Sequence, residues 1–550
     1  MNDHPDPFPF EELCRDLALR LTGRPSVTGT PDEAGFGPWL AEILTAESRL
    51  GPTAEVWTFP VEEGDPRLCV ACMVRGSGRA TVLLTGHYDT VTTSDYGDLE
   101  EVALRPEELA PRLRARLESA RPGSAEWLAR EDLASGRFLP GRGLLDMKAG
   151  LAAGLSAMAA FAADPRARGN LLFIAVPDEE NASAGARRAA VELGPLARER
   201  GLEIRLAVNL DAIADDGDGT AGRVVALGTV GKVLPTAFVV GAPVHSGFPL
   251  RGLNAAVLAA ALAQRLEWAP ELTDETAAEP GTPVSLLSLK DGKAGYDVTT
   301  PGTAFAYWNV LNHRRDPARV LDIVEALARE AVRACVEDLH ARALRSGQPS
   351  GPIATAPEVP ILRYSQLLAR VRATDAAIDQ AVAAEGARLA ATGMPFPDIC
   401  QVLTAMLWTR SGLSGPAIVL GLGSTPYLAT ELADPRTRAD IDALLAEAPA
   451  RHGTSLHAVD YFAGISDMSF FGQGDAGAFA RLAPETPAWD TCVRLGPSSL
   501  AGVPTVNLGP WGRDYHTPLE RIEADYGFRV LPRLLFDLAT RVLRSGGVTT

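Results

Sequence analysis

The chain of 550 residues contains only six cysteines, at positions 14, 69, 72, 335, 400 and 492. This number is too small for a disulfide framework, which excludes a small secreted fold stabilised by disulfides. Cys69 and Cys72 have the spacing of a metal-binding or redox pair, but they lie in the apolar run RLCVACMV. Residues three apart on a strand point to opposite faces, so we expect buried, unpaired thiols in a reducing, cytoplasmic compartment.

Positive charge and long apolar segments are also scarce. Asp and Glu outnumber Lys and Arg by 69 to 52, which gives a formal net charge of −17. Such an acidic chain is not expected to bind nucleic acid or anionic membranes. The first residues lack the basic and apolar regions of a signal peptide. The longest apolar stretch, 149–163, is shorter than the ~20 residues that span a bilayer.

Strands and helices alternate through the first 215 residues. Apolar runs that end in polar residues predict buried strands at 80–91, 170–180 and 204–215, and helices are predicted at 149–163 and 183–199. This alternation predicts an α/β fold with a doubly wound, mostly parallel sheet. In such sheets the functional residues follow the carboxyl ends of the strands.

The alternation of strands and helices changes near residue 227. The length of 550 residues favours two or three domains. A β-α-β-β-α order over 227–345 predicts an α+β lid domain inserted into a catalytic domain whose first part is 1–226. Residues 346–412 are interpreted as a mainly helical insertion. Residues 413–550, with a predicted strand at 415–424, are interpreted as the second part of the catalytic domain. An acidic stretch, 95–137, predicts a further helical insertion with a solvated face.

Side chains that bind metals follow three of the predicted strands, and two more lie elsewhere in the chain. They are His87 and Asp89, Glu179 and Glu180, Asp211, Asp146 before the 149–163 helix, and His516 near the C-terminus. Imidazole and carboxylate are ligands of zinc and similar divalent ions, and one carboxylate can bridge two ions. Any one of these residues is more often a helix cap or an ion-pair partner, but the five segments together favour a metal site.

Two neighbouring pairs can divide their roles. Successive side chains diverge at a strand end, so one glutamate of the pair 179–180 can bind a metal while the other acts as general base. Asp89 follows His87 by two residues and points the same way on a strand. Its carboxylate is therefore expected to hydrogen-bond the second ring nitrogen of His87 and to orient the ring.

Five motifs carry a resemblance to a known family. They are G-H-x-D-x-V at Gly86–Val91, G-R-G-x-x-D-x-K-x-G at Gly141–Gly150, D-E-E at Asp178–Glu180, His516 with Pro-x-Glu after it, and H-x-x-x-P-x-x-G-x-N-A at His245–Ala255. The chain resembles the di-zinc amidohydrolases and exopeptidases that include carboxypeptidase G, acetylornithine deacetylase, succinyl-diaminopimelate desuccinylase, aminoacylase and peptidase T. The long first insertion and YFAGISDMSFF at 461–471 most resemble the branch of the arginine-utilisation protein RocB.

The resemblance implies a role for each residue. His87 and Asp211 would bind one divalent ion, Glu180 and His516 the other, and Asp146 would bridge them. Two zinc ions are expected, with cobalt or manganese as alternatives. Glu179 would act as general base, and Asp89 would orient His87. His245, in the lid, would hydrogen-bond the oxyanion, and it comes from the partner subunit in dimeric relatives. Asp467 would line the site.

The lid departs from the family pattern where substrate is recognised. The asparagine that usually holds a substrate carboxylate is absent, and Asp297 lies near its position. An acid there predicts a preference for cationic substrates. The alternative is that Asp297 caps the turn before Thr299. Arg314 is then the candidate partner for the α-carboxylate of the substrate.

These observations predict a cytoplasmic metallohydrolase, monomeric or homodimeric, that cleaves an amide bond in a small amino-acid-like or peptide-like substrate. The first alternative is an N-acyl or N-carbamoyl amino-acid amidohydrolase, a deacylase, in arginine catabolism. The second is a catalytically idle binding protein, which the presence of Glu179 and of every expected ligand disfavours.

Overall fold

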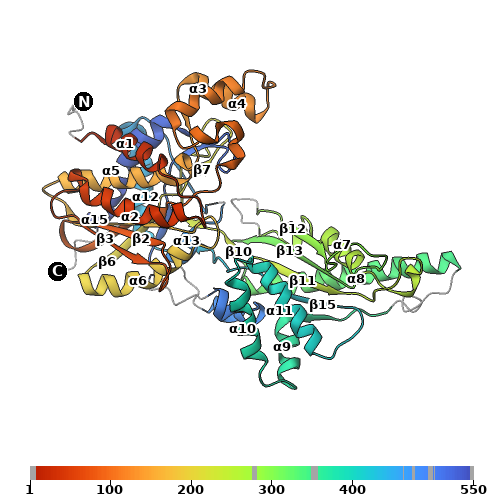
Figure 1. Cartoon of the computed structure of the whole chain (residues 1–550). Coiled ribbons are helices and arrows are strands. Elements are labelled where there is room, and N and C mark those ends of the chain that lie inside the picture. The colour runs from red at the N-terminus through yellow and green to blue at the C-terminus, as the bar shows by residue number, and fades with distance from the viewer. Residues whose placement is uncertain are drawn as a thin grey trace. The chain divides into compact units, whose positions relative to one another are not determined.

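The computed structural model describes residues 8–274, 281–347, 357–462, 464–472, 477–493, 500 and 502–545. The chain folds into two compact units (Figure 1). Unit 1 comprises residues 1–229, 430–474 and 497–550, and unit 2 comprises residues 230–429 and 475–496. Strands β9 (Gly228–Thr229) and β16 (Thr430–Glu431) pair where the chain leaves and re-enters unit 1.

Unit 1 is built on an eight-stranded sheet. In spatial order its strands are β1 (Glu55–Pro60), β2 (Leu68–Arg75), β5 (Arg168–Val176), β3 (Ser77–His87), β6 (Glu203–Asn209), β18 (Thr505–Asn507), β8 (Val224–Ala226) and β17 (His457–Val459). The central strands β5, β3, β6 and β18 are parallel, whereas β1 and β2 add antiparallel strands at one side. The predicted α/β class with a doubly wound sheet is confirmed.

Helices cover both faces of this sheet. The core on one face includes α1 (Phe10–Thr22), α2 (Pro31–Ala46), α5 (Ala149–Ala163), α12 (Pro435–His452) and α15 (Leu531–Ser545). Helices α6 (Ala184–Arg200) and α13 (Met468–Phe471) pack on the other face. Two cysteines of β2 point to opposite faces of the sheet. Cys72 lies in the core that contains α5, whereas Cys69 donates to the Gly185 carbonyl of α6. Four of the six cysteines are buried, Cys335 and Cys492 are half-buried, and no disulfide is formed among the described residues.

The segment Leu144–Ala163, which ends in α5, is long and apolar enough to meet the criteria for a membrane span. It is nevertheless completely buried inside unit 1. The central helix of a domain core meets the same criteria, because every side of it contacts other apolar groups.

The predicted helical insertion is present in unit 1 as residues 94–135, which we call the insertion. It consists of η2 (Ser94–Val102), α3 (Pro106–Arg116) and α4 (Ala125–Ser135), and it has a small apolar core of its own. Leu519, from the C-terminal part of the chain, packs against this core. Beside it lies a four-stranded sheet of β4 (Phe138–Pro140), β20 (Arg521–Glu523), β19 (Trp511–Arg513) and β7 (Ile213–Ala214).

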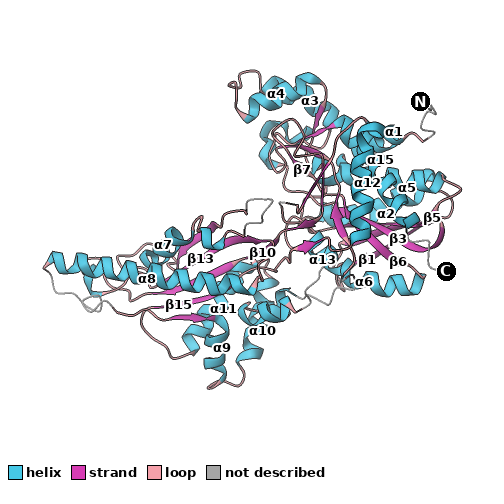
Figure 2. Cartoon of the chain, turned by 180° about the vertical axis from the view of Figure 1, so that it is seen from behind, coloured by secondary structure: helices cyan, strands magenta, loops and turns pink. Residues whose placement is uncertain are grey.

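Unit 2 is a sheet with helices on both faces (Figure 2). Its strands follow the order β12 (Ser285–Asp291), β13 (Thr303–Asn312), β11 (Pro235–Val240), β15 (Ala417–Leu422) and β14 (Ile361–Arg363), and β10 (Gly231–Val233) also pairs with β13. One core includes α7 (Ala255–Leu266) and α8 (Ala318–Ser346). The other includes α9 (Tyr364–Arg372), α10 (Ile378–Ala390) and α11 (Phe396–Arg410), while α14 (Ala478–Leu482) joins the first core.

The division of the chain differs from the sequence prediction after residue 345. Strand β15 pairs with β11 and β14 of unit 2, so residues 413–429 do not belong to the catalytic part. The helices of 346–412 pack on the second face of the same sheet, where Phe238 and Val240 of β11 meet them. The prediction was wrong here because an apolar strand pattern reports burial but not which sheet the strand joins.

Candidate active site

The expected metal ligands and Glu179 gather at the carboxyl edge of the main sheet of unit 1. His87 is the last residue of β3, Glu179 and Glu180 follow β5, and Asp211 follows β6. Strands β5, β3 and β6 are parallel neighbours, so their ends lie side by side. Asp146 comes from the segment η3 (Leu144–Lys148) that leads into α5, and His516 from the turn between β19 and β20. The topology therefore brings together residues from positions 87 to 516.

Asp146 lies between two histidines. Its Oδ1 is 3.1 Å from His87 Nε2, and its Oδ2 is 3.1 Å from His516 Nε2. Each histidine also lies near a second carboxylate. His516 Nε2 is 3.1 Å from Glu180 Oε2, and His87 Nε2 is 3.9 Å from Asp211 Oδ1. Each carboxylate oxygen of Asp146 thus faces a different histidine.

These distances fit a pair of divalent ions. Ligand atoms that sit ~2.0–2.2 Å from a tetrahedral zinc ion are about 3.3–3.6 Å from one another. The separations of 3.1–3.9 Å between donor atoms lie around that value. Ligand atoms of His87, Asp146 and Glu180 also lie within 4.8 Å of one another. The arrangement can hold one ion beside His87 and Asp211 and another beside Glu180 and His516, with Asp146 shared.

The backbone carbonyl of Asp89, and not its carboxylate as expected, contacts the second ring nitrogen of His87. His87 Nδ1 donates to the backbone carbonyl of Asp89 at 3.0 Å, whereas the nearest carboxylate oxygen of Asp89 is 3.7 Å away. With its proton on Nδ1, the ring presents the lone pair of Nε2 to the site. The carboxylate instead accepts the backbone N–H groups of Glu179 and Glu180, at 3.1 and 3.2 Å, and the Thr28 hydroxyl at 2.8 Å.

The two histidines hold protons strongly in the metal-free protein. Burial lowers the pKa of His87, but the hydrogen bond to Asp146 and the charges of Glu179 and Asp146 outweigh it and raise the pKa well above 6.5. Burial likewise opposes protonation of His516, yet its hydrogen bonds to Asp146 and Glu180 raise its pKa to about 10. For Asp146, burial is outweighed by the two histidines, which lower its pKa.

Three buried acids lie next to this pair. Burial and the charge of Asp146 raise the pKa of Asp211 to about 8. Burial also raises the pKa of Glu179 well above its usual value, and the negative charge of Asp467 adds to this shift. Asp467, which was expected to line the site, is itself buried and has a pKa raised to about 7, mainly by burial. Glu179 Oε2 lies 4.0 Å from His87 Nε2, beside the group of ligands.

Asparagine side chains that sequence reasoning missed hold Asp211 in place. Asn507 at the end of β18 accepts the N–H of Asp211 at 3.1 Å and donates to its carbonyl at 2.9 Å. Asn209 donates to Asn507 at 3.0 Å and to the Ser466 hydroxyl at 2.9 Å. The only signal in the sequence is that each asparagine precedes a buried leucine at a strand end, in Asn-Leu-Asp and Asn-Leu-Gly.

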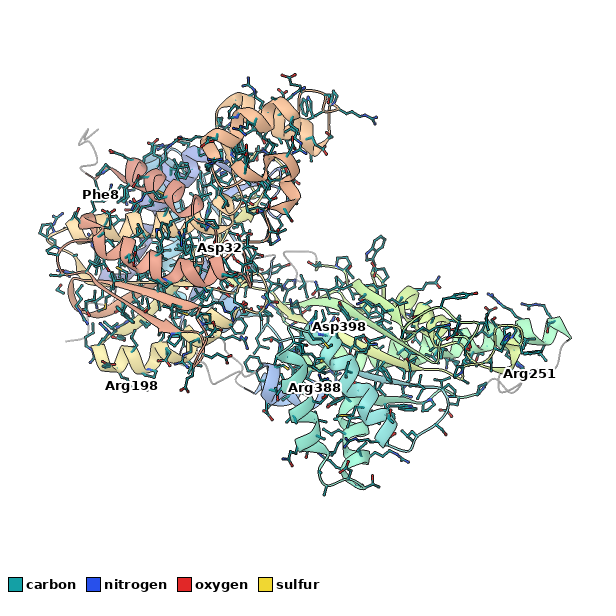
Figure 3. All side chains as sticks on the ribbon, viewed as in Figure 1. Phe8, Asp32, Arg198, Arg251, Arg388 and Asp398 are labelled. Atoms are coloured by element: carbon teal, nitrogen blue, oxygen red, sulfur yellow. The ribbon has the colours of Figure 1, made fainter. Side chains whose placement is uncertain are left out.

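His245 belongs to unit 2, in the loop after β11. Its Nδ1 accepts the N–H of Gly247 at 3.0 Å, so Nε2 carries the proton in the neutral ring and is available as a donor. The neighbouring segment is fixed by backbone bonds from Ser246 to Val298 and from Thr300 to Val244. Arg251, labelled in Figure 3, lies 4.6 Å from the ring centroid of the exposed Phe248 in the same loop.

The two remaining expected substrate residues are also in unit 2, and their surroundings differ. Asp297 accepts the N–H of Thr299 at 2.6 Å and pairs with Lys293 Nζ at 2.7 Å. It therefore caps the turn before Thr299, as in the alternative interpretation, and Lys293 compensates its charge. Arg314 is exposed, and its backbone N–H donates to Asp274 at 3.0 Å.

Comparisons with known proteins identify the family of this chain. Residues 122–527 match the model of peptidase family M20/M25/M40. The chain is similar to the uncharacterized protein YqjN of Bacillus subtilis, with 29% identity over 531 residues that cover 94% of each chain. It is also similar to protein RocB of Bacillus subtilis, with 26% identity over 560 residues that cover 98% of this chain and 96% of RocB. A tripeptidase of Staphylococcus aureus has a similar fold, with a TM-score of 0.54, 16% identity and coverage of 97% of this chain and 99% of that one.

Proposed function

Because this chain belongs to peptidase family M20/M25/M40 and is a metal-dependent hydrolase, we propose that the cluster around Asp146 is a two-metal centre for amide-bond hydrolysis. The observation that carries the proposal is the shared carboxylate, since each oxygen of Asp146 faces a different histidine at 3.1 Å. A carboxylate in this position can bridge two ions. His87 and Asp211 would hold one ion, and Glu180 and His516 the other. Zinc fits the donor set of nitrogen and oxygen atoms.

Glu179 is the proposed general base. When bound, the two ions supply Lewis-acid activation of a water nucleophile and of the substrate carbonyl. Glu179 would accept the proton of the attacking water and deliver it to the leaving amine. Its raised pKa favours the second half of this task, because a carboxyl group that holds a proton is a better acid–base shuttle near neutral pH. Asp89 fixes the backbone N–H groups of Glu179 and its neighbour, which sets the direction of the carboxylate.

His245 is the proposed donor to the oxyanion that forms when the carbonyl is attacked. Its Nδ1 is engaged by Gly247, so Nε2–H is the remaining donor. A donor placed where negative charge develops stabilises the transition state. His245 lies on unit 2, whereas the proposed metal ligands and Glu179 lie on unit 1.

The proposed substrate is a small amino-acid-like or peptide-like molecule with a scissile amide bond. The same machinery cleaves a peptide bond and removes an N-acyl group, since both reactions expel an amine from a tetrahedral intermediate. The proposed compartment is the reducing cytoplasm, which fits the lack of a disulfide among the described residues. A panel of di- and tripeptides and N-acyl and N-carbamoyl amino acids would identify the leaving group and the acyl side.

Metal analysis tests the centre directly. The protein as purified, or after equilibration with zinc, should hold two divalent ions per chain, and Asp146→Asn should lose both because it removes the shared ligand. Less than one ion per chain in the wild type after zinc equilibration would exclude the two-metal centre. Retention of both ions in Asp146→Asn would exclude the bridging role.

A further inference from the structure

The insertion 94–135 contacts the segments that carry two of the proposed metal ligands. We propose that Asp95 and Asp132 of the insertion are positioning residues for the metal centre, acting through the buried side chains of Arg142 and Arg521. This inference rests on the proposed assignment of Asp146 and His516 as ligands. It adds a function to a part of the chain that lies outside the sheet and its strand ends.

The first connection runs from Asp146 to Arg142. Glu520 Oε1 accepts the backbone N–H groups of Leu145 and Asp146 at 3.2 and 3.3 Å. The other oxygen of Glu520 accepts Arg142 Nη1 at 2.8 Å. Both side chains are 1% exposed. The backbone of the shared ligand is therefore held by a buried ion pair, and any displacement of Arg142 is transmitted to Asp146.

The insertion supplies further contacts to Arg142. Arg142 Nη2 donates to Asp95 Oδ2 at 2.6 Å, and the guanidinium lies 5.2 Å from the centroid of the Tyr96 ring. Nε donates to the carbonyl of Thr92, just before the insertion, at 3.0 Å. The planar guanidinium thus has a different acceptor on each of its three nitrogens, which fixes its orientation. Asp95 provides the second negative charge beside this cation.

The second connection runs from His516 to Arg521. The turn that carries His516 contains two non-glycine residues in the left-handed region, Asp514 with φ of 55° and His516 with φ of 62°. Such residues keep this conformation only where the surroundings hold them. Arg521 Nη1 donates to Asp514 Oδ2 at 2.6 Å and to the Leu519 carbonyl at 2.9 Å. One side chain therefore ties together the two ends of the turn.

Asp132 of α4 holds Arg521 from the opposite side. Its Oδ2 accepts Arg521 Nε at 2.8 Å, lies 2.7 Å from Nη2, and is 3.1 Å from Arg513 Nε. The side chains of Arg521, Arg513 and Asp132 are 0%, 7% and 11% exposed. Removing the negative charge would leave two buried cations with less compensation, and a buried uncompensated charge moves toward water or loses its geometry. Leu519, in the same turn, also packs on the core of the insertion.

The ligands at the strand ends have different supports. His87 is held by the carbonyl of Asp89, and Asp211 by Asn507, neither of which belongs to the insertion. Loss of Asp132 should therefore weaken the ion beside Glu180 and His516 more than the ion beside His87. Loss of Asp95 acts on Asp146, which is shared, and should weaken both ions.

The test is zinc binding to the metal-free, full-length protein, measured by competition with a chromophoric chelator. Loss of a residue that orients a metal ligand typically weakens metal affinity ~10–100-fold. We expect such a loss for one of two zinc ions in Asp132→Asn and for both ions in Asp95→Asn. Asp132→Glu keeps the charge and should recover most of the affinity.

Asp98→Asn is the matched control in the same insertion. Asp98 is 79% exposed and pairs only at the surface with Arg116, at 2.9 Å. Exposed pairs of this kind contribute little, so its zinc affinities should stay within about twofold of wild type. Wild-type zinc affinities in both Asp132→Asn and Asp95→Asn would overturn the inference, as would an equal loss in Asp98→Asn.

One further measurement keeps the outcome unambiguous. Circular dichroism of each metal-free variant shows whether the fold is retained. If Asp132→Asn does not fold, Asp95→Asn decides alone, because Asp95 lies at the exposed end of its network with 31% of its side chain accessible. A wild type that binds no zinc would contradict the proposed function, whereas a wild type that binds two ions with unaffected variants would contradict only this inference.

Discussion

The two units of the chain differ in where charged and apolar side chains lie. Among the described residues, every buried acidic or basic side chain (Asp, Glu, Lys, Arg or His) lies in unit 1, including His87, Asp146, Arg142 and Arg521. Every exposed large apolar side chain among them lies in unit 2. These are Phe248, Val257, Trp268, Leu287, Leu289, Tyr296, Val298, Leu344 and Val402.

This difference separates the unit that holds the proposed metal ligands and Glu179 from the unit that carries His245. Burying an ionisable group destabilises a fold unless the group is paired, so a dense set of such groups marks a site where chemistry is carried out. Unit 2 instead consists of a sheet between two apolar helical layers. Its proposed contribution, the imidazole of His245, is exposed on a loop.

The largest expected effect tests whether the chemistry is confined to the buried charges of unit 1. Glu179→Ala should lower kcat by ~10²–10⁴ because it removes a positioned acid–base group, while both metal ions are retained. Kinetics together with elemental analysis measure the two quantities. Glu180→Ala is the comparison, since it removes a proposed ligand and should lose metal. The reverse pattern would mean that the two glutamates exchange roles.

A second substitution tests whether a residue of unit 2 also stabilises the transition state. His245→Ala should lower kcat by ~10²–10³, the usual effect of losing an oxyanion donor. Metal content should not change, because His245 is not among the proposed ligands. His340→Ala, on α8 of the same unit, is a suitable control. Wild-type kcat in His245→Ala would exclude the oxyanion role and leave all the chemistry in unit 1.

The pH dependence of metal binding sharpens the comparison for unit 1. In the metal-free protein, the pKa of His516 is raised to about 10, that of Asp211 to about 8 and that of His87 well above 6.5. These groups carry protons at pH 7, and metal binding must displace them. Zinc affinity should therefore rise with pH, about tenfold per pH unit for each proton released. Calorimetry in buffers of different ionisation enthalpy counts the protons, and an affinity that is independent of pH from 6 to 7.5 would contradict this account.

The smallest expected effect concerns Asp297 in unit 2. Its charge is already compensated by Lys293, so Asp297→Asn should change kcat/KM by less than about threefold for cationic, neutral and acidic substrates alike, as for other exposed pairs. Arg314→Ala is the comparison, and it should raise KM if its guanidinium receives the substrate carboxylate. A change in substrate ranking in Asp297→Asn would restore its proposed role in charge selection.

Sequence patterns were sufficient for the main sheet and for the residues at its edge. Apolar runs with polar ends located β3, β5 and β6, and the metal-competent residues at those ends meet because parallel strands place their carboxyl ends together. The same kind of pattern assigned β15 to the wrong unit, since it contains no information about strand partners. The pairing of Asp297 with Lys293 was also missed, because a loop sequence does not reveal which of its charges meet.

The sequence by itself determined the fold class, the family and the candidate residues of the site, because these depend on residue types at local positions in strands and loops. Only the tertiary structure decided which atoms of these residues contact one another. It placed the carbonyl of Asp89, not its carboxylate, on His87, and it brought the insertion to Arg142 and Arg521. Contacts such as Asp132 with Arg521 join residues that are 389 positions apart. Such pairs form only when packed layers bring distant segments together and burial makes each remaining charge find a partner.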